Sequence, residues 1–428
     1  MVLILYTFLS YLLLPFFFLR LIIRGLKDKD HWKRWHERLG ISILNKPIRE
    51  VLWVHAVSVG EVNAAMPLLR SLLANYPDKD VLVTTSTLTG SKILLSKIGD
   101  RVYHQYLPFD LPYFIDRFLC FWEPKALILL ETELWPNIVN SCHKKNIFTF
   151  LVNARLSRES LNKYLYVKKL LSETLIKVTA IFTQYETDAS RFKHLCPEHL
   201  SIEVCGNLKF DYDPPKEINI ISESIRQDWS IEGKNRPTFI AASTHEGEEE
   251  IILDAFTEIL RFDQDSLLIL VPRHPERFDR VFKKIKKRNF IIARRSLDDD
   301  ISQEVNVLLG DTMGELSLLY SVSDVAFIGG SLIDHGGQNL LEPASIGLAI
   351  CSGKSLRNFE DISNQLKKVK ALELVENQKN IKDFFISVTK DSALKESMGV
   401  AAKRVFLDNK GAVNSILRLL DRYLVQSK

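Results

Sequence analysis

Short runs of aliphatic and β-branched residues alternate with longer helical patterns from residue 51 onward. This alternation is typical of stacked βαβ units, whose parallel strands are buried by helices on both faces. The strands expected in the first half are residues 51–56, 81–85, 126–130 and 149–152. Those expected in the second half are residues 238–242, 267–271, 305–309, 325–328 and 348–351. The sequence therefore predicts an α/β fold with doubly wound parallel sheets.

A polar stretch separates the two halves. It begins at Asp211 and contains Pro214 and Pro215, which cannot extend a helix or a central strand. The length of 428 residues also favours two domains. The predicted organisation is a Rossmann-like domain over 51–210, a linker over 211–236, and a second Rossmann-like domain with C-terminal helices over 237–428. The two domains are expected to face a cleft, with ligands at the carboxyl ends of the strands.

The first 19 residues carry no charged side chain, and Arg20, Arg24, Lys27 and Lys29 follow them. About 20 apolar helical residues span a hydrocarbon core of about 30 Å. A secretory signal carries its basic residues before the apolar run, whereas here they come after it. We therefore predict a membrane anchor over residues 1–24, with the body of the protein on the cytoplasmic side. The alternative is a helix embedded in one leaflet, which Pro15 favours.

Residues 25–50 are predicted to form a basic and aromatic interfacial segment. Between residues 20 and 49, nine Lys and Arg stand against three Asp and Glu. Trp32, Trp35 and Leu39 share one face of a predicted helix, and tryptophan beside arginine suits the headgroup region of inner-membrane lipids. Alternatively, these aromatic residues pack on the soluble domain and the charges are only solvated. The two interpretations are compatible.

Composition and motif content argue against several classes of protein. A formal net charge of +4 is too small to indicate nucleic acid as a partner. The five cysteines are scattered and form no CxxC pair, which argues against a disulfide framework or a zinc cluster. The sequence has neither a dinucleotide-binding G-x-G-x-x-G nor a P-loop. The D-x-D spacings at 78–80, 211–213 and 298–300 lie in polar turns, so no metal ligand is predicted.

The first candidate site follows the strand expected at 51–56. Ser58, Gly60 and Glu61 stand at the start of the next helical pattern. Backbone N–H groups and the helix dipole favour a carboxylate over a carboxylic acid there. Glu61 is therefore expected to be ionised at neutral pH and able to accept a proton from a sugar hydroxyl. An ordinary acidic helix cap is the alternative.

A second group of polar residues follows the strand expected at 126–130. Glu131, Glu133 and Trp135 lie directly after it. Carboxylates recognise sugar hydroxyls by hydrogen bonds, and tryptophan stacks on the apolar face of a sugar ring. Helix capping by the two glutamates is the alternative. Arg155 follows the next strand and can reach either an anionic ligand or one of these glutamates.

In the second half, Ser243 and Thr244 lead from a strand into a helix, where free N–H groups and two hydroxyls favour an anion. Arg273 and His274 follow the adjacent strand. A guanidinium in this place can bind a phosphate in bidentate fashion. Helix N-termini and surface arginines are common, so neither pattern is specific by itself.

The strongest signal is the glycine-rich segment 329–344, GGSLIDHGGQNLLEPA. Its four glycines permit close approach of the backbone and unusual dihedral angles. Asn339 and Glu342 lie one turn apart on one face of the helix that follows. A carboxylate in this position can accept the hydroxyl protons of a ribose. A tight turn with a capping glutamate is the alternative.

Eight ordered features carry a family resemblance. They are the apolar N-terminus, HAVSVGE (55–61), ETELWPN (131–137), NARLS (153–157), GNLK (206–209), PRHPER (272–277), GDTMGE (310–315) and the glycine-rich segment. Together they resemble the 3-deoxy-D-manno-octulosonic acid (Kdo) transferases of lipopolysaccharide biosynthesis. The resemblance covers almost the whole chain in order, which makes it more specific than any one motif.

The resemblance implies a GT-B glycosyltransferase that transfers Kdo from the donor CMP-Kdo to a lipid A precursor, lipid IVA. The reaction is then inverting, independent of metal and without a cofactor, and it takes place at the cytoplasmic face of the inner membrane. The first domain binds the acceptor and the second binds the donor. Two alternatives stay open: a membrane-associated GT-B enzyme that uses another nucleotide sugar, and a non-catalytic nucleotide-binding membrane scaffold.

The same resemblance assigns roles to individual residues. Glu61 takes the position of the general base. The positions that match donor binding are Ser243, Thr244, Arg273, His274, Met313, Gly314, Gly330, Asn339 and Glu342. The positions that meet Kdo and the acceptor are Ser58, Gly60, Glu131, Glu133, Arg155 and Lys209.

Overall fold

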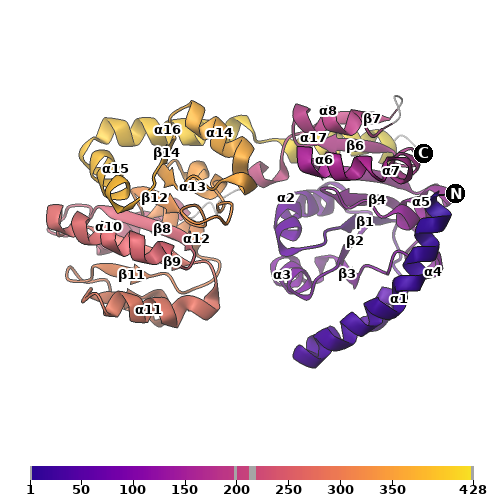
Figure 1. Cartoon of the computed structure of the whole chain (residues 1–428), viewed down its shortest axis with the longest axis horizontal. Coiled ribbons are helices and arrows are strands. Elements are labelled where there is room, and N and C mark those ends of the chain that lie inside the picture. Colours follow the sequence, from indigo (N-terminus) through magenta and orange to yellow (C-terminus); the bar gives the residue numbers. More distant parts are fainter. Residues whose placement is uncertain (1, 197–199, 212–217, 426–428) are drawn as a thin grey trace. The chain divides into compact units, whose positions relative to one another are not determined.

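The computed structural model describes residues 2–196, 200–211 and 218–425. The chain divides into two units, whose elements are labelled in Figure 1. The first unit combines Met1–Tyr212 with Asn409–Lys428, and the second is Asp213–Asp408. Each unit is built on one seven-stranded parallel sheet. The predicted α/β class is confirmed.

The first sheet has the strand order β3-β2-β1-β4-β5-β6-β7. Its strands are β1 (Val51–His55), β2 (Asp80–Thr85), β3 (Tyr103–Tyr106), β4 (Pro124–Leu130), β5 (Phe148–Ala154), β6 (Ala180–Thr183) and β7 (Ser201–Val204). The helices of this unit are α1 (Val2–Lys27), α2 (Val59–Asn75), α3 (Leu88–Ile98), α4 (Pro112–Trp122), α5 (Pro136–Lys144), α6 (Arg158–Leu165), α7 (Lys168–Leu175), α8 (Glu186–Lys193) and α17 (Ala412–Leu424). Leu52 and Val54 of β1 pack with α2, α3 and α17, whereas Val51 and Trp53 pack with α4 and α5. Both faces of the sheet are therefore apolar, as buried parallel strands require.

The second sheet has the order β10-β11-β9-β8-β12-β13-β14. Its strands are β8 (Thr238–Thr244), β9 (Leu267–Pro272), β10 (Ile292–Arg294), β11 (Val307–Leu309), β12 (Val325–Ile328), β13 (Ala349–Ser352) and β14 (Leu372–Leu374). The helices are α9 (Ile218–Asp228), α10 (Glu248–Phe262), α11 (Phe278–Lys286), α12 (Leu316–Ser321), α13 (Leu341–Ile346), α14 (Glu360–Lys368), α15 (Gln378–Lys390) and α16 (Ser392–Asp408). Phe239 of β8 and Phe327 of β12 pack with Phe256 of α10 and Phe385 of α15 in one core. Helices far apart in the sequence therefore close the same face of the sheet.

All nine strands expected from the sequence are present, with ends that shift by at most two residues. Five further strands were not expected: β3, β6, β7, β10 and β14. Four of them are the outermost strands of the two sheets. Outer strands are short and need less apolar surface, so their sequences show little of the pattern of a buried strand. The buried His104 and Gln105 of β3 illustrate this.

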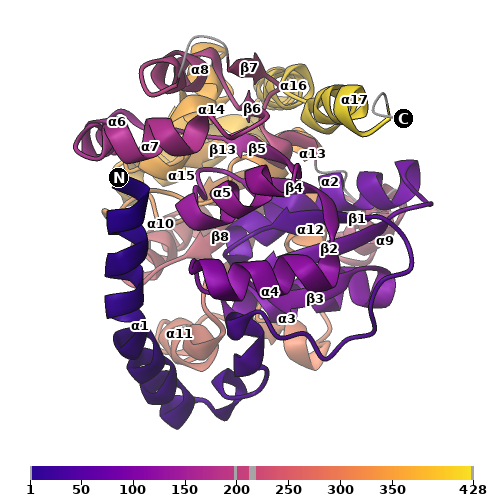
Figure 2. The ribbon, with the colours of Figure 1, turned by 90° about the vertical axis from the view of Figure 1, so that its right-hand side faces the viewer.

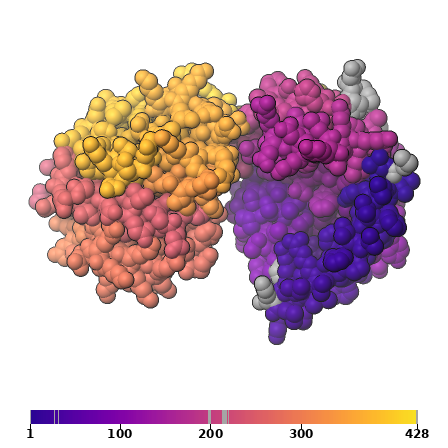
Figure 3. All heavy atoms as spheres, viewed as in Figure 1, coloured from indigo at the N-terminus to yellow at the C-terminus, as the bar shows by residue number. Residues whose placement is uncertain are grey.

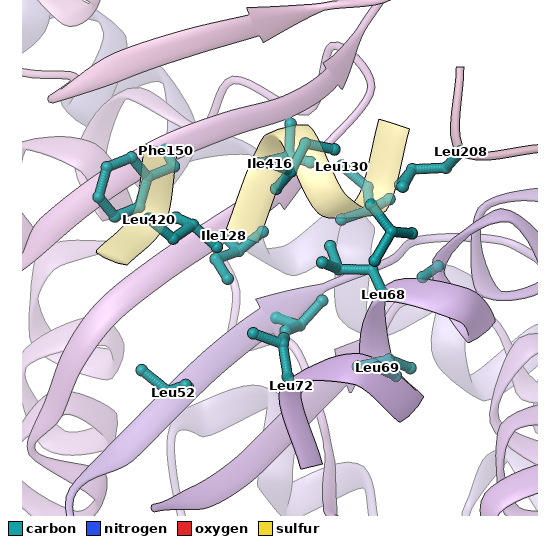
Figure 4. Close-up of a cluster of buried hydrophobic side chains, with 14 of the residues drawn as sticks. Leu52, Leu68, Leu69, Leu72, Ile128, Leu130, Phe150, Leu208, Ile416 and Leu420 are labelled. Carbon is teal, nitrogen blue, oxygen red and sulfur yellow. The ribbon is translucent and has the colours of Figure 1, made fainter. Parts of the chain in front are cut away.

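The last helix, α17, belongs to the first unit. Figure 4 shows Ile416 and Leu420 of α17 against Ile128 and Leu130 of β4 and Phe150 of β5. The predicted assignment of residues 409–428 to the second domain is therefore wrong. The physical reason is that the apolar stripe of α17 covers part of the first sheet next to α2, and burial of that surface outweighs proximity along the chain.

The predicted linker is partly structured. Asp211 accepts a hydrogen bond from the N–H of Gly411 at 2.6 Å and so helps to begin α17. Arg226 of α9 forms an ion pair with Asp324 at 2.9 Å, within the second unit. The linker prediction is therefore wrong for residues 218–236. Pro214 and Pro215 lie outside the described residues.

Helix α1 continues without a break through Pro15. Half-buried or buried positions recur every three or four residues along it, at Leu3, Thr7, Ser10, Leu14, Phe18, Leu21 and Gly25. This stripe faces the first unit, where α1 contacts α5 and α7 (Figure 2). The remaining faces expose large apolar side chains: Ile4, Leu5, Phe8, Leu9, Leu12, Leu13, Phe16, Leu19, Ile22, Ile23 and Leu26. Figure 3 shows α1 in indigo on the surface of the first unit.

Two hydrogen bonds fix the start of α1. Tyr6 donates to Asp110 at 2.8 Å, and Thr7 donates to the side-chain oxygen of Asn137 at 2.7 Å. By length and composition, Val2–Leu26 can cross a membrane. Because α1 also packs along the first unit, a helix lying within one leaflet fits these contacts as well as a spanning helix does.

The segment after α1 differs from the single helix expected there. It forms two short 3-10 helices, η1 (Lys29–His31) and η2 (Trp35–Leu39). Arg34 lies between them with a left-handed φ of 65°, which interrupts a helical run. Its guanidinium donates to the backbone oxygen of His104 at 2.7 Å, while Trp32 and Trp35 are each 45% exposed. The alternative that the charges are only solvated is therefore wrong for Arg34, and both tryptophans stay available to a lipid surface.

Candidate functional site

Both sheets reverse their strand order beside the central strand. In the first sheet β2 and β3 lie on one side of β1, and β4 to β7 lie on the other. In the second sheet β9 lies on one side of β8 and β12 on the other. Loops diverge at such switch points and leave room for ligands at the carboxyl ends of the strands. Most of the predicted site residues follow the strands at these points. Arg155, Lys209, Met313 and Gly314 follow strands farther out in the two sheets.

Glu61 occupies the first turn of α2. Its side chain is 8% exposed. One carboxylate oxygen accepts the N–H of Val57 at 2.8 Å, and the other accepts the hydroxyl of Ser58 at 2.9 Å. These contacts bind the residues just before α2, as an acidic helix cap does. The capping role and a role in proton transfer are compatible. Gly60 is exposed beside them.

The electrostatics of Glu61 differ from the expectation. Burial raises the pKa of Glu61, and the charge of Glu131 acts in the same direction, against the lowering effect of the hydrogen bonds. Burial therefore opposes the effect of the helix start, and ionisation of Glu61 at neutral pH stays a prediction. Glu133 is also affected, because burial and then the charge of Glu61 raise its pKa to about 7. Three carboxylates thus share one partly buried region.

Glu131 and Glu133 do not cap α5. Glu131 adopts a left-handed φ of 54° directly after β4, and Glu133 accepts the indole N–H of Trp135 at 3.1 Å. Instead, Asp110 accepts the N–H of Ile138 at 2.8 Å at the start of α5. The capping alternative for the two glutamates is wrong. Asp110, which the sequence analysis missed, supplies the cap from 28 residues away.

Asn153 connects the loop after β5, which carries Arg155, to the loop after β7, which carries Lys209. It is fully buried with a left-handed φ of 55°. Its side-chain oxygen accepts the N–H of Leu208 at 3.0 Å, and its backbone oxygen accepts the Gln184 amide at 3.0 Å. Arg155 and Lys209 lie on the loops held in this way. Neither forms an ion pair with any described carboxylate, so both charges are available to an anionic ligand.

In the second unit Ser243 has a left-handed φ of 56° at a bulge in β8. Thr244 is fully buried and donates to Glu249 at 3.2 Å. The expectation that both hydroxyls face an anionic ligand is therefore wrong for Thr244. A Cβ at Gly329 would lie 2.4 Å from the backbone oxygen of Ser243, so only glycine permits this approach of β12 to β8.

The buried carboxylate of Glu248 accepts hydrogen bonds from backbone N–H groups of the glycine-rich segment. Glu248 accepts the N–H groups of Gly330, Ser331 and Leu332 at 2.7, 3.0 and 3.0 Å, and that of His245 at 2.9 Å. The side chain is fully buried. The expectation that N–H groups at the start of α10 are free for a ligand is therefore wrong for His245, because the protein supplies its own anion.

Three histidines gather where β8, β9 and β12 end. The ring of His245 lies 5.4 Å from that of His274 and 4.1 Å from that of His335. Burial lowers the pKa of His245 to about 4, and the neighbouring His335 adds to this effect. Arg273 is exposed beside them and has no ion pair with a described carboxylate. The sequence analysis missed this cluster, although each histidine follows the end of an expected strand.

Asn339 and Glu342 contact each other as the sequence predicts. The Asn339 amide donates to Glu342 at 3.0 Å, and its oxygen accepts the N–H of Leu341 at 3.0 Å. Helix α13 begins at Leu341, so Asn339 precedes it, and the prediction that both residues lie on one face of this helix is wrong. Met313 is 68% exposed and Gly314 has a φ of 90° in the loop after β11.

Within residues 2–196, 200–211 and 218–425, no group of three His, Cys, Asp or Glu side chains is arranged to hold a metal ion. The five cysteines are free thiols. Asp211 of one D-x-D spacing binds backbone N–H groups at the start of α17, as described above. Asp213 of the same spacing lies outside the described residues.

Comparison with known proteins gives a consistent picture. Residues 33–212 match the family described as 3-deoxy-D-manno-octulosonic-acid transferase (kdotransferase). The chain is 37% identical over 421 residues to a 3-deoxy-D-manno-octulosonic acid transferase of Haemophilus influenzae, with 98% of each chain covered. It is 31% identical over 388 residues to a protein of the same description from Bordetella pertussis, with 88% of each covered.

Among solved structures, the chain resembles the UDP-GlcNAc 2-epimerase of Neisseria meningitidis bound to UDP-GlcNAc. The TM-score is 0.60 at 15% identity, with 87% of this chain and 100% of that chain covered. Identity at this level bears on the fold alone. It supports the predicted GT-B class of two Rossmann-like domains.

Proposed function

Because the chain belongs to the 3-deoxy-D-manno-octulosonic acid (Kdo) transferase family, we propose that it transfers Kdo from CMP-Kdo to a lipid A precursor, lipid IVA. The observation that carries the proposal is the 37% identity to a Kdo transferase over 98% of both chains. The protein is thus a glycosyltransferase.

Glu61 is proposed as the general base. A carboxylate with a raised pKa is a stronger base at neutral pH, and burial raises the pKa of Glu61. It removes the proton of the attacking acceptor hydroxyl, which then attacks the anomeric carbon in line and inverts its configuration. Ser58 orients the carboxylate through its 2.9 Å hydrogen bond. Gly60, the residue before Glu61, leaves the exposed turn beside it without a side chain.

The remaining acceptor-side residues are proposed to bind the two sugars. Glu131 and Glu133 accept hydrogen bonds from sugar hydroxyls, because carboxylates provide several acceptor positions. Arg155 and Lys209 bind the carboxylate of Kdo, since both carry a charge with no described protein partner. The left-handed Glu131 supports the assignment, because such backbone conformations concentrate at functional sites.

On the donor side, CMP leaves as a phosphate monoester whose negative charge grows during the reaction. We assign Arg273 and His274 to that phosphate, and the Asn339–Glu342 pair to the ribose. Met313, Gly314 and Gly330 are proposed to contact the rest of the nucleotide, as is the hydroxyl of Ser243. Positive charge on Arg273 stabilises the leaving group without a metal ion, so the reaction is proposed to need neither metal nor cofactor.

The membrane attachment is proposed to place α1 in the inner membrane with the two units on its cytoplasmic side. The apolar faces of α1 that the first unit leaves exposed support this placement. No nucleic acid partner is proposed. The predicted cleft between the two domains stays a prediction.

Mass spectrometry tests the proposal directly. The full-length protein is incubated with lipid IVA and a source of CMP-Kdo, and the expected product is lipid IVA that carries Kdo. In parallel, CMP should raise the melting temperature of the protein more than UDP does. Absence of a Kdo product, or stabilisation by UDP alone, would favour an enzyme that uses another nucleotide sugar.

A further inference from the structure

Arg38 stands at the carboxyl ends of β2 and β3. Its guanidinium donates to the backbone oxygen of Ser86 at 2.9 Å. It also lies over the ring of Tyr106, 4.9 Å from the ring centroid. The N–H of Phe109 binds its backbone oxygen at 2.9 Å. These contacts hold the guanidinium in one place.

Arg38 forms no ion pair within the described chain. The neighbouring Arg34 forms an ion pair with Glu37 at 2.6 Å, but no described carboxylate lies within ion-pair distance of Arg38. Burial lowers the pKa of Arg38, the charges of Tyr106 and Glu37 raise it, and the nearby charge of Arg24 lowers it further. A half-buried guanidinium that no carboxylate pairs directly is costly, which points to an anionic ligand.

Donors remain for such a ligand. A guanidinium has five N–H groups, and only one nitrogen of Arg38 makes a hydrogen bond to the protein. Its other two nitrogens are not among the buried atoms without a partner in the described residues, so they reach solvent. The free edge of the group can therefore bind an oxyanion in bidentate fashion.

Three hydrogen bonds connect Arg38 to the proposed base, and the first is the 2.9 Å bond to the backbone oxygen of Ser86. Ser86 donates its N–H to the backbone oxygen of Val57 at 3.2 Å, and Val57 donates its own N–H to Glu61 at 2.8 Å. Arg38 thus contacts the end of β2, the strand beside β1, and β1 leads to Glu61.

The end of the membrane anchor lies near enough to Arg38 for the charge of Arg24 to act on it. Arg24 is exposed in the last turns of α1, and Trp32 packs so closely on Gly25 that a Cβ there would lie 1.6 Å from the indole nitrogen. Trp32 and Trp35 are both half-exposed. Tryptophan and arginine in this combination suit the headgroup level of a membrane. Arg38 is therefore linked both to the lipid-facing segment and to the residues that hold the proposed base.

We propose that Arg38, assisted by Arg24, binds a phosphate group carried by the membrane-embedded glycolipid acceptor and so holds the acceptor sugar near Glu61. The inference rests on the proposed function. A phospholipid headgroup carries the same phosphate chemistry, but only a phosphate of the acceptor makes use of the connection to Glu61.

The test compares two acceptors with the full-length enzyme in micelles of a neutral detergent. One acceptor is a phosphorylated lipid A precursor, and the other is the same molecule after phosphatase treatment. Arg38→Gln should raise KM for the phosphorylated acceptor by about 10- to 100-fold, as expected for a lost charge-assisted pair. It should change KM for the dephosphorylated acceptor by less than about threefold. Lys33→Gln removes the same charge from an exposed position of the same segment and should change neither value.

The other outcomes are equally informative. An equal loss with both acceptors would make Arg38 a structural residue and overturn the inference. A defect that appears only with vesicles of anionic phospholipid, and not in neutral micelles, would assign the site to a headgroup and also overturn it. If the parent enzyme transfers no Kdo to either acceptor, the proposed function fails and the inference falls with it. If Arg38→Gln does not fold, the exposed Arg24→Gln should show the same selectivity at about three- to tenfold.

Discussion

Replacement of Glu61 by glutamine tests the proposed base at nearly constant structure. The amide oxygen can still accept the N–H of Val57, and the amide nitrogen can donate to the hydroxyl of Ser58. A neutral amide also avoids the cost of burying a charge. The variant should therefore fold and bind CMP like the parent enzyme, and any effect on turnover reports on the chemistry.

The expected loss follows from the role. A general base contributes about 10²- to 10⁴-fold in rate, which is about 3–5 kcal/mol in the barrier. Glu61→Gln should therefore reduce kcat by at least about 100-fold, with KM for CMP-Kdo changed by less than about threefold. A discontinuous assay of Kdo transfer to lipid IVA measures both. Turnover within about threefold of the parent would remove Glu61 from the mechanism.

The pH dependence gives a second readout of the same group. The base acts only when ionised, so activity should fall as the pH drops through the pKa of Glu61. Burial and Glu131 raise that pKa above its ordinary value, whereas the Ser58 hydrogen bond lowers it. Glu131→Gln should thus move the acid limb of kcat/KM to lower pH, and Ser58→Ala should move it to higher pH. A profile that neither substitution moves would contradict the assignment.

Four further outcomes are expected. The pKa of Glu133 rises from 4.5 to about 7 on folding, so its ionisation destabilises the fold as the pH increases through that range. Glu133→Gln should therefore raise the free energy of unfolding at pH 8 by about 1–2 kcal/mol after solvent screening, and leave it unchanged near pH 4. Urea titrations measure both values. Leu420→Ala removes a fully buried side chain and should cost about 2–5 kcal/mol, whereas Leu407→Ala, at a position 53% exposed, should cost less than about 1 kcal/mol. Activity should survive EDTA without added divalent ions, and a strict metal requirement would contradict the proposed chemistry. If α1 lies in one leaflet, a membrane-impermeant maleimide applied from the periplasmic side should leave Val2→Cys unlabelled, whereas labelling would show that the helix spans.

The central strands, and the strand ends that carry the candidate site residues, could be predicted from the sequence. Buried parallel strands are continuous apolar runs, so all nine were recognisable, and the residues after each of them necessarily gather at one edge of a sheet. Contact between Asn339 and Glu342 also follows from local spacing, because Asn339 directly precedes the helix that carries Glu342. These features depend on short stretches of sequence.

Partners distant in the chain could not be predicted in the same way. Glu248 binds the N–H groups of residues 330–332, more than 80 positions later, and nothing in its own neighbourhood distinguishes it from other glutamates. The same holds for Asp110 at the start of α5. Ser243 adopts a left-handed conformation that sequence analysis assigns to glycine, because the surrounding contacts determine it. The sequence also does not predict that α17 packs on the first unit, since an amphipathic helix does not specify which sheet it covers.

The return of α17 to the first unit has a consequence for how the protein is made. Ribosomes release the chain from its amino end, and domains usually fold in that order. Here the apolar surface at Ile128 and Phe150 stays exposed to solvent until residues 412–424 are synthesised, after the whole second unit. The lobe translated first is therefore completed last, and truncation of the final 20 residues should leave a nascent chain that is prone to aggregation and recognised by chaperones.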